Sequence, residues 1–209
     1  SNVDVLSVIG NDTTAKELEA LLESIEVKSD MLIIEQNRKT SKKSRLIASQ
    51  QQVLRYDNES IEDISSNSET QIINKLSAII SNYDVVILSD YGKGVLTTNL
   101  TQEIISISNK NKVKVFVDPK GKDYSKYKGA YTLTPNKKEA IEASNILIND
   151  NESLEKAIRK LKDECELEVS LITLSESGIA IFDDNLRIKP TVAREVYDVT
   201  GAGDTVIAS

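Results

Sequence analysis

The segment with the clearest chemical potential is the turn "TGAGD", which spans residues 200–204 near the end of the chain. Gly201, Ala202 and Gly203 are too small to cover their own backbone N–H groups, and a helical pattern follows them. Since exposed N–H groups at a helix N-terminus attract anions, these residues form a candidate anion hole. The alternative is an ordinary helix start. Asp204 favours phosphoryl transfer: its carboxylate would take a hydroxyl proton while the three amides hold the γ-phosphate oxygens.

The composition narrows the classes of function. The chain has 209 residues and a net charge of −7, from 26 basic and 33 acidic side chains, which argues against a nucleic-acid partner. It contains no histidine, the usual triad base and the commonest zinc ligand. The single cysteine, Cys165, lies among acidic residues that should raise its thiol pKa, so we expect no chemistry from it. No apolar run reaches membrane-span length and no signal segment opens the chain, so we expect no membrane partner and a cytoplasmic location.

Strand-like and helix-like segments alternate along the chain. The apolar runs "VDVLSVIG", "YDVVILSD", "VKVFVDPK" and "VSLITLSESG" are continuous rather than alternating, which indicates strands buried on both faces. Helical patterns such as "NLTQEIISISNK" and "LEKAIRKLKDEC" lie between them. The sequence therefore predicts an α/β fold: a mainly parallel sheet with helices on both faces. Ligands should bind beyond the carboxyl ends of the strands.

One region departs from this alternation. Residues 33–57 run from strand through the basic turn "RKTSKKSR" to strand without a helix, which predicts a small antiparallel β lid. The polar stretch "DNESIEDISSNSET" after it is interpreted as a solvated connection. A lid has an exposed edge, and a homodimer through the lid would cover that edge. Both ends look interrupted, so residues 1–209 are expected to be a partial domain that lacks N-terminal and C-terminal parts.

Two further clusters lie at predicted strand ends. "DPKGK" places Lys120 and Lys122 beside Asp118, where they are either surface charges or ligands of a polyphosphate or sugar phosphate. "NKKE", residues 136–139, is either a helix cap or a site that holds Mg²⁺ largely through water. Both roles of "NKKE" can coexist.

The turn and its surroundings resemble a known family. "DVTGAGDT" is similar to the C-terminal signature of the ribokinase-like (PfkB) sugar kinases. "PTVAREVYDVTGAGDTVIA", "DPKGKDYSKYKGAYTLTPNKKE", "LSDYGKGVL" and "TSKKSRLIASQQQVLRYD" together resemble the D-glycero-β-D-manno-heptose 7-phosphate kinases of ADP-heptose synthesis. The resemblance covers essentially the whole chain. It implies a ribokinase-like fold, an ATP and Mg²⁺ requirement, and phosphorylation of the sugar phosphate at O1 to the 1,7-bisphosphate, a step towards lipopolysaccharide.

The resemblance also implies roles for individual residues. Asp204 matches the catalytic base, and Gly201, Ala202 and Gly203 match the anion hole. The family's Asn-x-x-Glu element, which organises Mg²⁺ and phosphate through water, falls on Asn136, Lys137, Lys138 and Glu139. The nucleotide-binding turn, commonly Thr-x-Gly-x-x-Gly, falls on Thr173, Ser175 and Gly178, with Ser175 in place of the first glycine. Lys43 and Arg45 in the lid, and Lys120, are candidate ligands of the anionic sugar.

Two other hypotheses remain open. Another PfkB sugar or nucleoside kinase is the runner-up, because much of the sugar pocket, which would identify the substrate, is expected to lie outside the chain. A non-catalytic nucleotide- or sugar-phosphate-binding module is the alternative from a different class. The presence of Asp204 with all three anion-hole residues disfavours that module.

Overall fold

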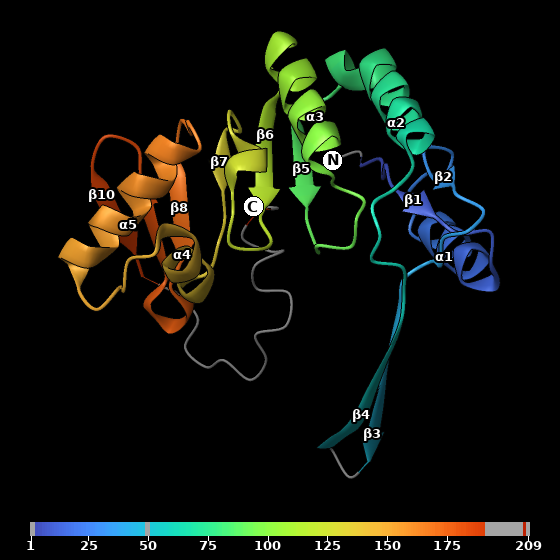
Figure 1. The fold of residues 1–209 in the computed structure, drawn as a ribbon, viewed down its shortest axis with the longest axis horizontal. Coiled ribbons are helices and arrows are strands. Elements are labelled where there is room, and N and C mark those ends of the chain that lie inside the picture. Colours follow the sequence, from blue (N-terminus) through green and yellow to red (C-terminus); the bar gives the residue numbers. More distant parts are fainter. Residues whose placement is uncertain (1–2, 49–50, 191–206, 208–209) are drawn as a thin grey trace. The chain divides into compact units, whose positions relative to one another are not determined.

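The structure is a computed structural model that describes residues 3–48, 51–190 and 207 (Figure 1). These residues divide into two compact units. The first unit holds Ser1–Ala78 and Lys93–Thr97, and the second holds Ile79–Gly92 and Thr98–Ser209. Both contain parallel strands with helices between them, so the predicted α/β class is confirmed. None of the described helices has the length and apolar character that a membrane span needs.

The first unit begins with a strand, a helix and a parallel strand, namely β1 (Val8–Ile9), α1 (Thr13–Ser24) and β2 (Ile33–Ile34). Helix α1 starts where it does because Asp12 caps it, with Oδ1 accepting from Ala15 N at 2.8 Å. The other carboxylate oxygen of Asp12 accepts from Thr40 N at 2.9 Å. The bond from Thr40 is the main reason why the pKa of Asp12 lies below its usual value. Asp12 thus ties the start of α1 to the segment that enters the lid.

The lid is a hairpin of β3 (Lys42–Ala48) and β4 (Gln51–Asn58), drawn as a long two-stranded ribbon in Figure 1. The predicted antiparallel hairpin is therefore confirmed, but Ile33–Ile34 lie outside it, since they pair in parallel with β1, and the place of its turn was wrong. Residues 42–45 of the basic run "RKTSKKSR" lie within β3, which continues to Ala48. Most of the hairpin is exposed on both faces, so lysine and arginine are tolerated in its strands and no burial pattern marks them.

The polar stretch after the lid was only partly a connection. Its last residues open α2 (Ser66–Ile79). Ser65 Oγ accepts from Ser68 N at 3.2 Å, as a helix cap does, and Ser68 Oγ donates to Glu35 Oε2 at 2.5 Å. Ile72 and Leu76, four residues apart, are buried. Serines that look like a linker in the sequence therefore start an amphipathic helix.

The second unit is built on a longer sheet. Three parallel strands lie side by side: β5 (Val85–Ser89), β6 (Lys114–Asp118) and β7 (Thr132–Leu133). An antiparallel set follows: β8 (Ser170–Thr173), β9 (Ile179–Phe182) and β10 (Leu186–Lys189). Val169 N donates to Tyr131 O at 3.1 Å and Thr173 N donates to Pro135 O at 2.9 Å. These bonds place β8 parallel to the line of β7.

Helices cover this sheet through apolar stripes. They are α3 (Thr98–Lys110), α4 (Lys137–Ser144) and α5 (Asn151–Glu164), with short 3-10 turns η1 (Ile80–Asn82), η2 (Ser125–Tyr127) and η3 (Ser175–Ser177). In α5 the buried residues recur with helical spacing, at Leu154, Ala157, Ile158 and Leu161. On β5, Leu88 is buried while Val85 and Ile87, which point to the opposite face, are 39% and 43% exposed.

Cys165 ends α5 and is buried. Burial raises the pKa of its thiol to about 11, and the charge of Glu164 adds to this effect. The direction of the pKa shift agrees with the sequence-based expectation, although burial contributes more than the neighbouring carboxylates.

Candidate active site

The predicted catalytic turn cannot be compared with the structure. Gly201, Ala202, Gly203 and Asp204 all lie outside the described residues. Their assignment therefore stays a prediction from the sequence, and the site is built here from the other candidates.

The "NKKE" element forms the start of α4. Asn136 Oδ1 accepts from Glu139 N at 3.0 Å, and Glu139 Oε2 accepts from Asn136 N at 3.0 Å, which is a complete capping box. The helix-cap interpretation is thus confirmed. Lys137 and Lys138, between them, are exposed. The cap uses only one carboxylate oxygen of Glu139, so the other is available for a second partner.

That second partner in the structure is Lys120, from the turn after β6. Its Nζ lies 3.5 Å from Glu139 Oε1, and its side chain is 55% exposed. The structure therefore brings together two candidates that the sequence separates by 19 residues. A cation and a carboxylate that share a strand-end surface suit a ligand with both phosphate oxygens and metal-bound water.

The predicted nucleotide turn lies beside the same cap. Thr173, at the end of β8, forms an isolated parallel bridge with Asn136. Across the turn, Leu174 N donates to Gly178 O at 2.8 Å. These residues therefore form the β8–β9 hairpin turn, and their role as a nucleotide-binding turn stays a prediction from the sequence.

Backbone geometry explains two residues of that turn. Gly178 has a φ of +97°, and a Cβ there would lie 1.9 Å from Lys189 O, so only glycine fits. Ser175 also has a positive φ, +53°. Glycine, the common residue here in the resemblance, adopts a left-handed conformation without strain, whereas serine adopts it at some cost in conformational energy.

The carboxyl end of β5 carries an acidic residue that sequence reasoning did not single out. Asp90 is buried, and its Oδ2 lies 2.5 Å from Lys126 Nζ and 2.6 Å from Tyr127 Oη. Tyr127 Oη also accepts from Lys120 N at 3.0 Å. Asp90 belongs to the stretch "LSDYGKGVL" of the family resemblance, but nothing in the sequence pairs it with a tyrosine 37 residues further on.

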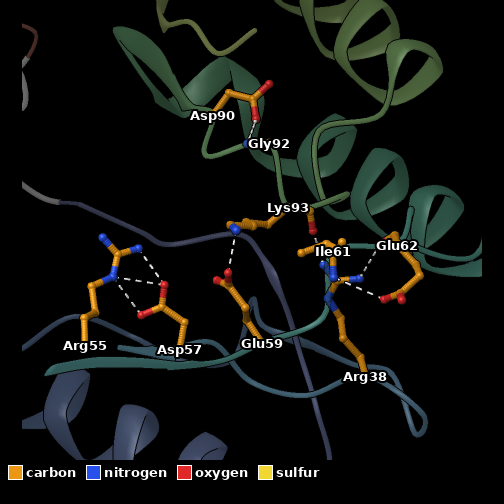
Figure 2. Close-up of polar contacts among 9 residues, drawn as sticks. All are labelled: Arg38, Arg55, Asp57, Glu59, Ile61, Glu62, Asp90, Gly92 and Lys93. Carbon is orange, nitrogen blue, oxygen red and sulfur yellow. Dashed lines mark hydrogen bonds and ion pairs between the residues drawn. The ribbon is translucent and has the colours of Figure 1, made fainter. Parts of the chain in front are cut away.

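The lid candidates belong to the first unit. Residues of β3 and β4 pair directly across the hairpin, Lys43 with Asp57 and Arg45 with Arg55. Arg55 binds Asp57 with two nitrogens, Nε at 2.9 Å and Nη2 at 2.5 Å (Figure 2). The hydrogen bond from Arg55 holds the pKa of Asp57 below its usual value. This face of the hairpin therefore carries three cations and one carboxylate.

A buried arginine fixes the base of the lid. Arg38, in the segment before β3, is 8% exposed and donates to the backbone carbonyls of Glu62 and Lys93 (Figure 2). Lys93 forms an ion pair with Glu59. A Cβ on Gly94 would lie 2.0 Å from Glu62 O, so the second glycine of "GKG" is required for this approach. Arg38 thus joins both ends of the lid to the "GKG" turn.

No group of three or more acidic, histidine or cysteine side chains converges on a common point in the described part of the chain. Of the residues predicted near Mg²⁺, Glu139 keeps one oxygen outside the capping box. Asn136 is exposed, with its amide oxygen used by the cap.

Comparisons with known proteins agree with this geometry. The family model described as pfkB family carbohydrate kinase matches residues 1–209. The chain is 71% identical to "Bifunctional protein HldE" of Aliarcobacter butzleri and 60% identical to the protein of that name from Sulfurimonas denitrificans, in both cases over its whole length and 44% of theirs. The structure of Arabidopsis thaliana ribokinase complexed with ribose and ATP matches 98% of this chain and 66% of its own, with 19% identity and a TM-score of 0.73. The fold is therefore ribokinase-like, and the chain belongs to the pfkB family of carbohydrate kinases.

Proposed function

We propose that the protein transfers the γ-phosphoryl group of ATP to O1 of D-glycero-β-D-manno-heptose 7-phosphate, giving the 1,7-bisphosphate for ADP-heptose and lipopolysaccharide synthesis. The observation that carries this proposal is the 71% identity to a bifunctional HldE protein across all 209 residues. Because ATP is the proposed phosphate donor, the cytoplasm is the proposed place of action.

We infer that these residues form part of a larger kinase domain with further N-terminal and C-terminal parts. The chain spans 44% of the length of the HldE proteins cited above. Val85 and Ile87 on β5 support the inference, since a parallel strand normally has both faces covered and these two side chains are 39% and 43% exposed.

In the proposed mechanism Asp204 accepts the proton of the acceptor hydroxyl. A general base positioned in this way typically contributes about 10²- to 10⁴-fold to the rate. The backbone amides of Gly201, Ala202 and Gly203 hold the oxygens of the moving phosphoryl group, where negative charge accumulates.

The strand-end cluster of the second unit is the proposed site of the nucleotide phosphates. Its residues are Asn136, Lys137, Lys138, Glu139, Thr173, Ser175 and Gly178. The bridge between Asn136 and Thr173 supports a single shared site. Glu139 Oε1 suits Mg²⁺, which binds through one or two carboxylates and keeps several waters. When bound, Mg²⁺ would neutralise phosphate charge.

The basic face of the lid is the proposed site of the remote sugar phosphate. Arg45 lies directly opposite Arg55, and like charges in that relation destabilise a hairpin. The carboxylate of Asp57 pairs with Arg55, and Arg45 forms no ion pair with a carboxylate of the described residues. A phosphate bound by Arg45 and Lys43 would relieve this repulsion, and arginine matches the geometry of phosphate.

We further propose a homodimer that pairs the lids. Leu46 and Leu54 pair across the hairpin and, with Tyr56 beside them, are each about 60% exposed. A two-stranded hairpin alone is marginally stable in water, so a partner for this apolar face is physically favoured.

A comparison of acceptors tests the proposed substrate. The full-length protein is assayed with Mg²⁺ and ATP on the heptose 7-phosphate, ribose, fructose 6-phosphate and adenosine. We expect the heptose 7-phosphate to give the highest kcat/KM, because binding of the remote phosphate helps orient the reacting end. A preference for ribose or adenosine would indicate another kinase of the same family, and no turnover with any acceptor would favour a non-catalytic binding module.

A further inference from the structure

The backbone of Lys120 is held by a buried tyrosine. Tyr127 has no exposed surface, and its Oη accepts a hydrogen bond from Lys120 N at 3.0 Å. The same Oη lies 2.6 Å from Asp90 Oδ2 and 3.3 Å from Lys120 O. A hydroxyl has a single proton to donate. The carboxylate of Asp90 is a stronger acceptor than the carbonyl of Lys120, and it lies closer. The bonds therefore run in one direction, from Lys120 N–H to the Tyr127 hydroxyl and from that hydroxyl to Asp90.

Three hydrogen bonds to the Asp90 carboxylate support its charge. Oδ1 accepts from Gly92 N at 2.7 Å (Figure 2), and Oδ2 accepts from Lys126 Nζ at 2.5 Å as well as from Tyr127. A buried carboxylate is costly unless it is paired and fully hydrogen-bonded, and this one is. Burial, followed by the hydrogen bond to Asp90, raises the pKa of Tyr127 far above its usual value, so the phenol stays protonated and remains a donor. Such a satisfied network makes the turn rigid.

The Lys120 side chain extends from this turn toward the start of α4. Lys120 Nζ lies 3.5 Å from Glu139 Oε1, and Glu139 caps α4 together with Asn136. Asn136 in turn bridges Thr173 at the end of β8. All of these residues lie within the second unit and are the proposed nucleotide residues, whereas the basic lid residues belong to the first.

We propose that Asp90 and Tyr127 are positioning residues that hold the backbone of Lys120, so that the Lys120 ammonium binds the polyphosphate of the nucleotide and not the phosphate of the sugar. This inference rests on the proposed kinase function. It adds Asp90 and Tyr127, which the sequence did not suggest. It also assigns Lys120 to the nucleotide, whereas the sequence left the nucleotide and the sugar phosphate both open.

Nucleotide binding to the full-length protein, measured by calorimetry with Mg²⁺ and a non-hydrolysable ATP analogue, tests the proposal without any acceptor. Tyr127→Phe removes one buried hydroxyl, and we expect it to weaken binding about threefold to tenfold. Lys120→Met should weaken it at least as much. With the acceptor added, both variants should raise KM for ATP and leave KM for the sugar unchanged, a split that a general loss of structure would not give.

Two matched controls lie next to the tested residues. Tyr124→Phe makes the same change in a tyrosine that is 4% exposed and whose hydroxyl has no hydrogen-bond partner among the described residues. Lys128→Met removes the exposed lysine that follows Tyr127 in the chain and pairs with Glu166. Neither control should change nucleotide affinity.

Wild-type nucleotide affinity in Tyr127→Phe would overturn the positioning role, and a raised KM for the sugar alone in Lys120→Met would overturn the assignment of its ligand. If Tyr127→Phe does not fold, hydrogen exchange in the wild-type protein decides: the Lys120 amide should exchange more slowly than the Lys122 amide, and equal rates would contradict the proposal. Should another sugar prove to be the acceptor, the binding measurements keep their meaning, so the two proposals fail separately.

Discussion

At the scale of single residues, Glu139 has one carboxylate oxygen in a structural role and a second oxygen for its proposed role as a ligand. One oxygen closes the capping box of α4 and the other lies toward Lys120. The cap uses Oε2 and the proposed ligand role uses Oε1, so the two interpretations of Glu139 do not compete. The geometry separates them, so a substitution that keeps the cap can test the ligand role alone.

Glu139→Gln is that substitution, because glutamine also completes a capping box. We expect the melting temperature to stay near that of the wild type, while the Mg²⁺ concentration for half-maximal activity rises by about tenfold or more. Activity is measured across a Mg²⁺ titration at saturating ATP. Glu142→Gln, on an exposed position of the same helix, is the control. An unchanged Mg²⁺ titration in Glu139→Gln would leave only the structural role.

Asp204→Asn tests the proposed base. The amide is nearly isosteric but cannot accept the acceptor's proton, so we expect kcat to fall by about 10²- to 10⁴-fold. Nucleotide affinity, measured by calorimetry, should change little, since the carboxylate is proposed to act on the acceptor hydroxyl. Turnover close to that of the wild type would mean that another group is the base.

At the scale of elements, the sequence predicted the strands and helices whose packing is visible in the spacing of their apolar residues. The continuous apolar runs that became β5, β6 and β8 were found, as was the amphipathic α5, because such spacing reflects packing. The predicted burial on both faces is not seen for β5, whose Val85 and Ile87 are exposed. The turn of the lid was misplaced and the start of α2 was missed, since an exposed hairpin has no burial pattern and the cap of α2 depends on Glu35, 30 residues away.

The same limit applies to the candidate site. "NKKE" and Lys120 were found because their residue types carry chemistry. Tyr127 was missed because its role depends on a contact with Asp90 that no local spacing encodes. A buried tyrosine near a polar strand end is visible only once the fold brings the two segments together.

The lid gives a prediction at the level of one strand. Successive residues of β3 point to opposite faces, so Lys42 and Arg45 lie on different faces of the hairpin. Arg45→Met should raise KM for the heptose 7-phosphate by about tenfold or more, the effect of losing a charge-assisted bond, and should leave KM for ATP unchanged. Lys42→Met is the control, since Lys42 pairs with Glu17 at the surface and such pairs contribute little. Equal effects of the two variants on the sugar would refute a specific phosphate site on the Arg45 face.

At the scale of the whole molecule, the apolar side chains left exposed among the described residues fall into different settings. Val85 and Ile87 lie on one face of a parallel strand, where a covering layer within the same domain is the usual arrangement. Leu46, Leu54 and Tyr56 lie on a two-stranded hairpin. Such a hairpin is marginally stable alone, and a second copy of the chain can cover its apolar face. Exposed apolar surface thus has two proposed partners, one within a longer chain and one in a second copy.

The lid pairing can be tested by mass in solution. Leu54→Lys places a charge in the centre of the apolar face, opposite Leu46, and a charge buried without a partner in an interface is strongly unfavourable. We expect the full-length wild type to sediment as a dimer and Leu54→Lys to shift toward the monomer at the same concentration. Ile61→Lys is the matched control, because Ile61 is 61% exposed but lies outside β3 and β4. A wild type that is monomeric at all concentrations, or a Leu54→Lys variant with unchanged mass, would exclude the lid as the dimer interface.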